Sequence, residues 1–189
     1  MVAKGRYVKP LFTIHGGEFL VGDFIEKNIR QVNLWIPSRD TGVDLLVTDS
    51  KNQKALALQV KFSRDFLVTH KLPSLRERLT ACGWWTIKRQ KLVNSKADYW
   101  VFVLLGFANR SKDFIVIKPT ELLVRLDSIH GPVETIQSYL WVTKDEKCWE
   151  ARGLNGSEEK AIAEGRYKHE VRDFSEYLNE WTPIQALDS

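Results

Sequence analysis

The sequence predicts a single α/β domain, and three observations support that fold class. The chain has 189 residues, 43% of them hydrophobic and 28% charged, which is enough apolar material for one buried core. Residues 17–29 carry apolar side chains at helical spacing, and the stretches that follow alternate apolar and polar residues as strands do. No segment rich in Pro, Gly or Ser divides the chain, so we expect one domain over residues 1–189.

The first part of the chain is predicted to form a helix and a three-stranded meander. Apolar residues recur every three or four positions over residues 17–29, which indicates a helix. Residues 31–36 alternate and stop at Pro37, as a strand would. Residues 43–48 and 55–62 are two further strands, and the polar segment between them predicts a β-hairpin.

The middle of the chain is predicted to contain one helix, two strands and a shorter helix. Residues 74–92 favour a helix interrupted near Gly83, and residues 99–107 and 114–118 favour strands. The longest apolar run of the chain, residues 100–108, is too short to cross a bilayer. Pro119 suits the first turn of a helix, which we expect to end near Leu126.

The C-terminal part gives weaker patterns. Residues 140–143 and 148–151 predict a second hairpin. Ser157, which precedes two glutamates, is a candidate N-cap with an acidic first turn. Residues 174–181 are predicted to form a last short helix.

Charge is distributed unevenly along the chain, whose net charge is +4. Between Lys61 and Lys96 nine Lys/Arg stand against two acidic residues, a net +7, whereas the rest of the chain carries −3. A basic segment of this kind favours a polyanionic partner, and the alternative is a solvated helix face.

Several classes of protein lack support in the sequence. The two cysteines, Cys82 and Cys148, are far apart, which argues against a disulfide framework or a zinc site and fits a reducing cytoplasm. No apolar run follows the first ten residues, so we expect no signal peptide and no membrane partner. Walker loops, dinucleotide-binding turns, HExxH and nucleophile elbows do not occur.

Three polar residues of the predicted hairpin are the candidate site. Gln59 and Lys61 point to the same face of their strand, because side chains alternate along a strand. A symmetric hairpin closing around Lys51 and Asn52 places Asp44 opposite Gln59, and cross-strand partners share a face. Each of the three could also be an ordinary solvent-exposed strand residue.

These groups are those that phosphodiester hydrolysis requires. Mg²⁺ binds hard oxygen ligands, and Asp44 offers a carboxylate and Gln59 an amide oxygen. Lys61 is a candidate for holding the attacking water or the scissile phosphate, or for acting as a general base. Glu18, at the start of the first helix, can add a carboxylate, although it can also simply complement the helix dipole. Gly16 and Gly17 would let the helix approach the site closely.

The chain here resembles the PD-(D/E)XK nuclease superfamily. The resemblance rests on a helix glutamate, the sequence Gly-Val-Asp-Leu-Leu-Val, and Gln-Val-Lys on the next strand, and its Gln-x-Lys form resembles the Mrr-like restriction endonucleases. It covers roughly residues 17–117. It implies a restriction-endonuclease-like α/β core, with a central mixed β-sheet, an antiparallel meander and flanking helices. It also implies catalytic roles for Glu18, Asp44, Gln59 and Lys61, the first three as metal ligands.

The function expected from this resemblance is hydrolysis of DNA phosphodiester bonds by a Mg²⁺-dependent endonuclease, with Mn²⁺ as a substitute metal. Double-stranded or branched DNA is the expected substrate. Restriction-type cutting and junction resolution need two incisions, which makes a homodimer a natural assembly. The catalytic core is expected over residues 11–130, with an extension of unassigned role over residues 131–189.

The sequence is also compatible with two other functions. Gln59 stands where most members of the superfamily have Glu or Asp, which favours a catalytically inactive nucleic-acid-binding module as an alternative. A protein-interaction scaffold is the third. For nucleic-acid contacts we expect Lys88, Arg89 and Lys91 to reach phosphates. Trp84 and Trp85 are predicted to pack in the core rather than stack on bases.

Overall fold

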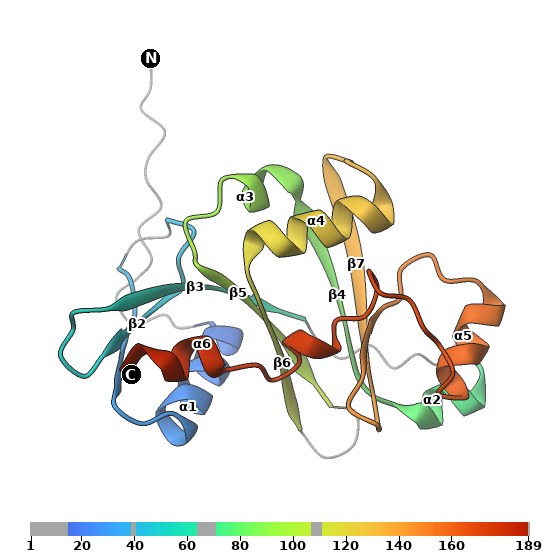
Figure 1. Cartoon of the computed structure of the whole chain (residues 1–189), viewed down its shortest axis with the longest axis horizontal. Coiled ribbons are helices and arrows are strands. Elements are labelled where there is room, and N and C mark those ends of the chain that lie inside the picture. The colour runs from blue at the N-terminus through green and yellow to red at the C-terminus, as the bar shows by residue number, and fades with distance from the viewer. Residues whose placement is uncertain (1–14, 39–40, 64–70, 107–110, 189) are drawn as a thin grey trace.

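The computed structural model describes residues 15–38, 41–63, 71–106 and 111–188 of the chain. It is an α/β fold with two β-sheets and flanking helices (Figure 1). In the first sheet β3 pairs with β5 in parallel and all other neighbours are antiparallel, so the sheet is mixed. Its strands, in spatial order, are β1 (Val32–Trp35), β2 (Leu45–Asp49), β3 (Ala55–Phe62), β5 (Tyr99–Leu105) and β6 (Lys112–Ile117).

The predicted meander and its register are confirmed. Strands β1, β2 and β3 are consecutive antiparallel neighbours. Leu45 pairs with Leu58, and Thr48 with Ala55, which is the register of a hairpin symmetric about its polar turn. The Asp49 carboxylate closes that turn by accepting hydrogen bonds from the backbone N–H groups of Gln53 and Lys54, at 2.6 and 2.9 Å.

The helix predicted over residues 74–92 is wrong. The segment forms a short helix α2 (Pro73–Arg78), a long strand β4 (Leu79–Lys88) and a single turn α3 (Arg89–Val93). Trp85 and Ile87 are buried while Trp84 and Thr86 are exposed, the two-residue period of a strand. A Cβ on Gly83 would lie 2.3 Å from the Trp85 ring, so this glycine makes room for the indole and does not break a helix.

Strand β4 belongs to a second, three-stranded antiparallel sheet. It pairs with β7 (Thr135–Thr143), which in turn pairs with β8 (Cys148–Glu150). The predicted hairpin of residues 140–143 and 148–151 is therefore confirmed, although β7 begins earlier. The C-terminal part of the chain thus supplies two of the three strands of this sheet.

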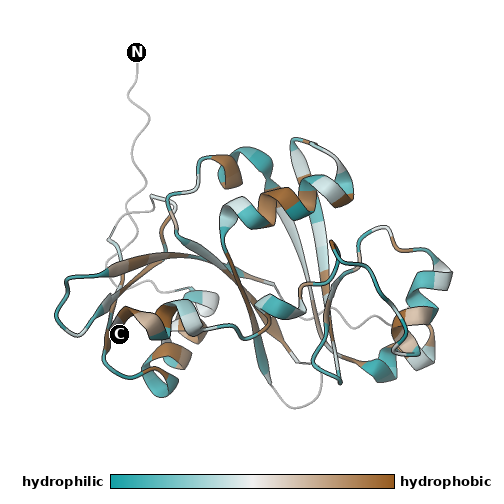
Figure 2. Cartoon of the chain, in the orientation of Figure 1, coloured by the Kyte–Doolittle hydropathy of each residue, from teal (hydrophilic) through white to brown (hydrophobic). Residues whose placement is uncertain are grey.

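Apolar side chains form three layers of core. One lies between α1 (Gly16–Asn28), α6 (Thr182–Gln185) and one face of the first sheet. A second lies between the other face of that sheet, the inner face of the second sheet and α4 (Pro119–His130). The third lies on the outer face of the second sheet, under α2 and α5 (Gly156–Ala163), which sit together at the right of Figure 1. Figure 2 shows hydrophobic residues along the central strands and a hydrophilic tip on the β2–β3 hairpin.

Three predicted helix boundaries need correction. Helix α4 continues beyond Leu126 to His130 and ends at Gly131, whose φ of +77° suits glycine. The N-cap of α5 is Asn155 and not Ser157, because the Asn155 side chain already accepts hydrogen bonds from two backbone N–H groups of the first turn. Of the helix predicted over residues 174–181 only a short 3-10 turn, η1 (Ser175–Tyr177), is present, and α6 and η2 (Ala186–Asp188) follow after residue 181.

Both cysteines are free and buried, and burial raises the pKa of the Cys148 thiol well above its ordinary value. Over the described residues, none of the helices combines the length and the apolar character that crossing a membrane requires.

Candidate active site

The hairpin brings Asp44 and Gln59 together as its register predicts. Gly42, with a φ of +86°, turns the chain away from β3 just before Asp44. The carboxylate of Asp44 then accepts the Val60 backbone N–H through Oδ2 at 2.8 Å. The same Oδ2 accepts the Gln59 side-chain amide at 2.5 Å. Asp44 is only 7% exposed, so these hydrogen bonds hold a buried carboxylate in place.

The orientation of the Gln59 amide follows from this network. Because its Nε2 donates to Asp44, its carbonyl Oε1 is directed elsewhere, and a Cβ on Gly42 would lie 3.8 Å from it. The amide oxygen is the atom of Gln59 that can serve a cation. Gly42 leaves the space beside that oxygen open.

Lys61 lies on the same face of β3, two residues further along. Its Nζ is 5.0 Å from the centre of the Trp100 ring on the neighbouring parallel strand. Trp100 is 1% exposed and donates its indole N–H to Ser95 Oγ at 2.9 Å, so the ring is fixed. A fixed aromatic face attracts the ammonium group and restricts where Lys61 can reach.

Glu18 reaches the site from the other face of the sheet. It is the third residue of α1, is 4% exposed, and accepts the His15 backbone N–H through Oε2 at 3.2 Å. The start of α1 lies against β3, where a Cβ on Gly17 would be 2.6 Å from the Phe62 Cβ. Of the two glycines expected to allow a close approach, Gly17 does so, since a larger residue there would push the helix and Glu18 away, whereas a Cβ on Gly16 would meet nothing within 4 Å. Glu26, the other glutamate of α1, is exposed.

All four predicted site residues line one cavity of about 620 Å³. The hairpin and α1 form one wall, and α3 with the segment after it forms another. That second wall contributes Gln90, Lys91, Asn94, Ser95 and Lys96. Two carboxylates therefore share a cavity with three lysines, and all three lysines belong to the basic segment of residues 61–96.

Six of the nine basic residues of this segment fall into two groups in the structure. One group forms ion pairs, Lys71 with Glu159, Arg78 with Asp145 at 2.6 Å, and Arg89 with Asp127 at 2.6 Å. The other group, Lys61, Lys91 and Lys96, lines the cavity. Arg64 lies outside the described residues.

The three predicted nucleic-acid contacts have different surroundings. Lys91 lines the cavity. Lys88 is exposed and donates to Thr135 Oγ1 at 2.6 Å, on the outer face of the second sheet. Arg89 is held by both oxygens of Asp127, which lowers the pKa of that carboxyl and raises the pKa of the guanidinium. Arg89 thus links α3 to α4 through this ion pair.

Sequence reasoning missed some residues of this region. His15 precedes the predicted helix and lines the cavity, and its position next to Gly16 could have indicated this. Lys96 also lines it, but only the fold brings it there. Trp84, predicted to be buried, is 41% exposed, whereas Trp85 is 6% exposed and packs in the core.

The donor set at the cavity fits a hard divalent cation. Carboxylate oxygens and an amide oxygen are ligands that Mg²⁺ accepts, and the cavity leaves room for water in the remaining positions. No group of three or more His, Cys, Asp or Glu side chains that could hold a metal occurs in the described part of the chain. Any site here would therefore use Gln59 beside the two carboxylates.

Searches against protein-family models, curated proteins and solved structures found no match to this chain.

Proposed function

We propose that the chain is a Mg²⁺-dependent endonuclease that hydrolyses DNA phosphodiester bonds, with a core like that of PD-(D/E)XK nucleases. The observation that supports this most is the meeting of Glu18, Asp44, Gln59 and Lys61 at one cavity. Glu18 comes from α1, Gln59 and Lys61 come from β3, and Asp44 directly precedes β2. The mixed sheet with its antiparallel meander is compatible with the same proposal.

In this proposal Asp44, Glu18 and the Gln59 oxygen hold the cation. When bound, Mg²⁺ would activate the attacking water and neutralise charge that builds on the phosphate. Lys61 positions the water or the scissile phosphate, and Trp100 beneath it limits its motion. Lys91 and Lys96 on the opposite wall attract the nucleic-acid backbone. The Asp44–Gln59 hydrogen bond keeps both side chains in position before the substrate arrives.

A second candidate is an inactive nucleic-acid-binding module with the same fold. Gln59 favours it, because replacing a carboxylate by a neutral amide removes one charge that would hold the cation. Calorimetric titration with Mg²⁺ or Mn²⁺, with DNA present, separates the two candidates. The nuclease binds the metal, and Gln59→Glu increases its metal affinity. The inactive module shows no metal binding, and Gln59→Glu alone need not restore it.

The activity test is cleavage of plasmid, linear duplex, single-stranded and four-way-junction DNA with Mg²⁺ or Mn²⁺. Wild type is compared with Lys61→Ala, and with Lys51→Ala as a matched control, since Lys51 is an exposed lysine in the β2–β3 turn outside the cavity. We expect a loss of at least about a hundredfold in rate for Lys61→Ala, the scale of a positioned catalytic group, and no loss for Lys51→Ala.

Three results would count against the proposal. Equal activity in wild type and Lys61→Ala would point to a contaminant or to another site. Equal losses in both lysine variants would indicate a general charge effect. No cleavage of any substrate, with DNA still bound, would favour the inactive module.

A further inference from the structure

The outer face of the second sheet is only partly covered. Helices α2 and α5 pack on it through Leu75 and Ile162, which meet Leu79, Trp141 and Trp149 of the sheet. Toward the end of β4 none of the described helices covers this face, and there Trp84 is 41% exposed. Trp84 therefore lies at the edge of the covered part of this face, and neither α2 nor α5 packs on its ring.

The open part carries a defined set of side chains because of the β4–β7 register. Trp84 pairs with Tyr139, Thr86 with Gln137 and Lys88 with Thr135, and cross-strand partners share a face. Arg152, just after β8, adds a guanidinium 5.4 Å from the centre of the Trp84 ring. We call this surface the Trp84 face and define it by Trp84, Thr86, Lys88, Thr135, Gln137 and Arg152.

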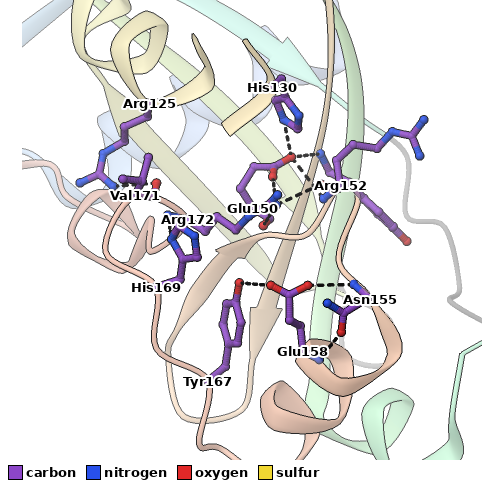
Figure 3. Close-up of polar contacts among 11 residues, drawn as sticks. Arg125, His130, Glu150, Arg152, Asn155, Glu158, Tyr167, His169, Val171 and Arg172 are labelled. Carbon is purple, nitrogen blue, oxygen red and sulfur yellow. Dashed lines mark hydrogen bonds and ion pairs between the residues drawn. The ribbon is translucent and has the colours of Figure 1, made fainter. Parts of the chain in front are cut away.

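Arg152 is held at this face by its backbone and its side chain. Its N–H donates to the fully buried Glu150 carboxylate at 3.3 Å, and its carbonyl accepts Arg172 Nη1 at 3.0 Å. Its side chain points away from Glu150 (Figure 3) and donates to Gln137 Oε1 at 3.0 Å. Among the described residues Arg172 and Arg89 pair with carboxylates, but Arg152 has no ion pair recorded.

The chemistry of the Trp84 face suits a single nucleic-acid strand. It has an accessible aromatic ring, two cations, and hydroxyl and amide groups, and its six residues include no carboxylate. Bases stack on exposed aromatic rings, and the adjacent cations neutralise phosphates. A duplex keeps its bases stacked on each other and offers no free base face to Trp84.

We propose that the Trp84 face binds single-stranded nucleic acid, with a base stacked on Trp84 and phosphates contacted by Arg152 and Lys88. Lys88 directly precedes α3, and α3 supplies Lys91 to the cavity that holds Asp44 and Lys61. The Trp84 face and the candidate active site are therefore connected through α3. Binding needs no cleavage, and only the role of the bound strand as substrate rests on the proposed nuclease function.

The test is the affinity of the full chain, without divalent metal, for labelled strands measured by fluorescence anisotropy. The probes are an oligothymidylate, an abasic strand of equal length and the corresponding duplex. Wild type should prefer the oligothymidylate over the abasic strand by about fivefold or more. Trp84→Ala should remove most of that preference, and Trp84→Phe, which keeps a ring, should retain part of it.

Two further variants separate stacking from charge and from loss of fold. Trp35→Ala removes a tryptophan that is 50% exposed on β1, in the other sheet, and should leave the preference unchanged. Arg152→Gln should weaken binding of both single strands and lower the salt dependence of binding by about one unit of slope. Unchanged melting temperatures for all variants establish that the fold is intact.

The proposal is overturned if wild type shows no preference for bases, or if Trp84→Ala keeps the full preference. An equal loss of duplex and oligothymidylate binding in Trp84→Ala would overturn it too, because a duplex offers no free base to the ring. Failure of the nuclease is distinguishable, because the stacking preference would persist in a chain that cleaves nothing. Lys61→Ala should keep the preference while losing cleavage.

Discussion

At the scale of single residues, Asp44 has a structural role in the fold and a proposed role as a metal ligand. The turn at Gly42 removes a strand partner from the Val60 N–H, and the Asp44 carboxylate takes its place. A buried donor without a partner costs about 1–3 kcal/mol. A carboxylate held in this way needs no rearrangement to receive a cation. Mutations of Asp44 can separate the two roles, because a neutral side chain can keep the hydrogen bond to Val60 without binding a cation.

We expect Asp44→Asn and Asp44→Ala to differ in stability but not in activity. The asparagine oxygen can still accept the Val60 N–H, so that variant should remain close to wild type in urea unfolding. The alanine variant leaves the donor unpaired and should lose about 1–3 kcal/mol. Both remove the charge and should abolish Mg²⁺ binding in calorimetry. A fully active Asp44→Asn would show that the carboxylate serves the fold alone.

At the scale of elements, the sequence predicted strand pairs that are close in sequence, and it did not predict pairs that are far apart. The hairpin of β2 and β3 is contiguous in sequence, so alternation and a polar turn define its register, and with it the pairing of Asp44 with Gln59. Strand β4 pairs with β7, about fifty residues later, and nothing local marks that partner. Leu75, Leu79 and Cys82 also fall at three- and four-residue spacing, so the segment carried a helical signal.

The candidate site follows the same rule. Gln59 and Lys61 were predictable because a strand fixes their relative direction. Glu18 was a candidate because of its place at the start of the first helix, and its burial beside β3 depends on a helix–sheet contact through Gly17. The wall formed by Lys91 and Lys96 depends on where β4 delivers α3, and β4 was predicted as helix.

The contact between α3 and α4 gives a pH-dependent prediction. Arg89 lowers the pKa of Asp127 below its ordinary value of 3.8, so the ionised pair stabilises the fold above that pH. This contribution is lost as pH falls through the lowered pKa. The pair is partly exposed, so we expect Asp127→Asn to lower the melting temperature only slightly at neutral pH.

Thermal melts of wild type and Asp127→Asn across pH test this coupling. Their difference should shrink as the solution becomes acidic and vanish when Asp127 is protonated in both states. Asp98→Asn offers a control on a carboxylate without an ion pair recorded among the described residues. A difference between Asp127→Asn and wild type that persists in acid would show that the aspartate acts through packing or neutral hydrogen bonds.

At the scale of the whole molecule, the C-terminal part is integral to the core. The extension over residues 131–189 supplies β7 and β8 to one sheet and returns to cover the other. Asn179 makes that return possible, since its side chain accepts the Phe114 N–H at 2.9 Å and its own N–H donates to the Phe114 carbonyl at 2.6 Å. Beyond it Trp181 stacks on Phe24 of α1, with ring centres 4.7 Å apart.

Because Trp181 joins α1, β6 and the chain end, its removal should destabilise the whole molecule. Trp181 is 4% exposed and also meets Phe114 edge-on at 5.1 Å, so Trp181→Ala should cost about 3–5 kcal/mol, and Trp181→Phe less. Urea unfolding followed by circular dichroism and by tryptophan fluorescence should give one coincident transition, shifted to lower urea in Trp181→Ala. Trp35→Ala, at an exposed tryptophan, should shift it little. Two separate transitions would instead show that the sheets unfold independently, and the α1–β6 layer would then lose stability while the second sheet kept its own.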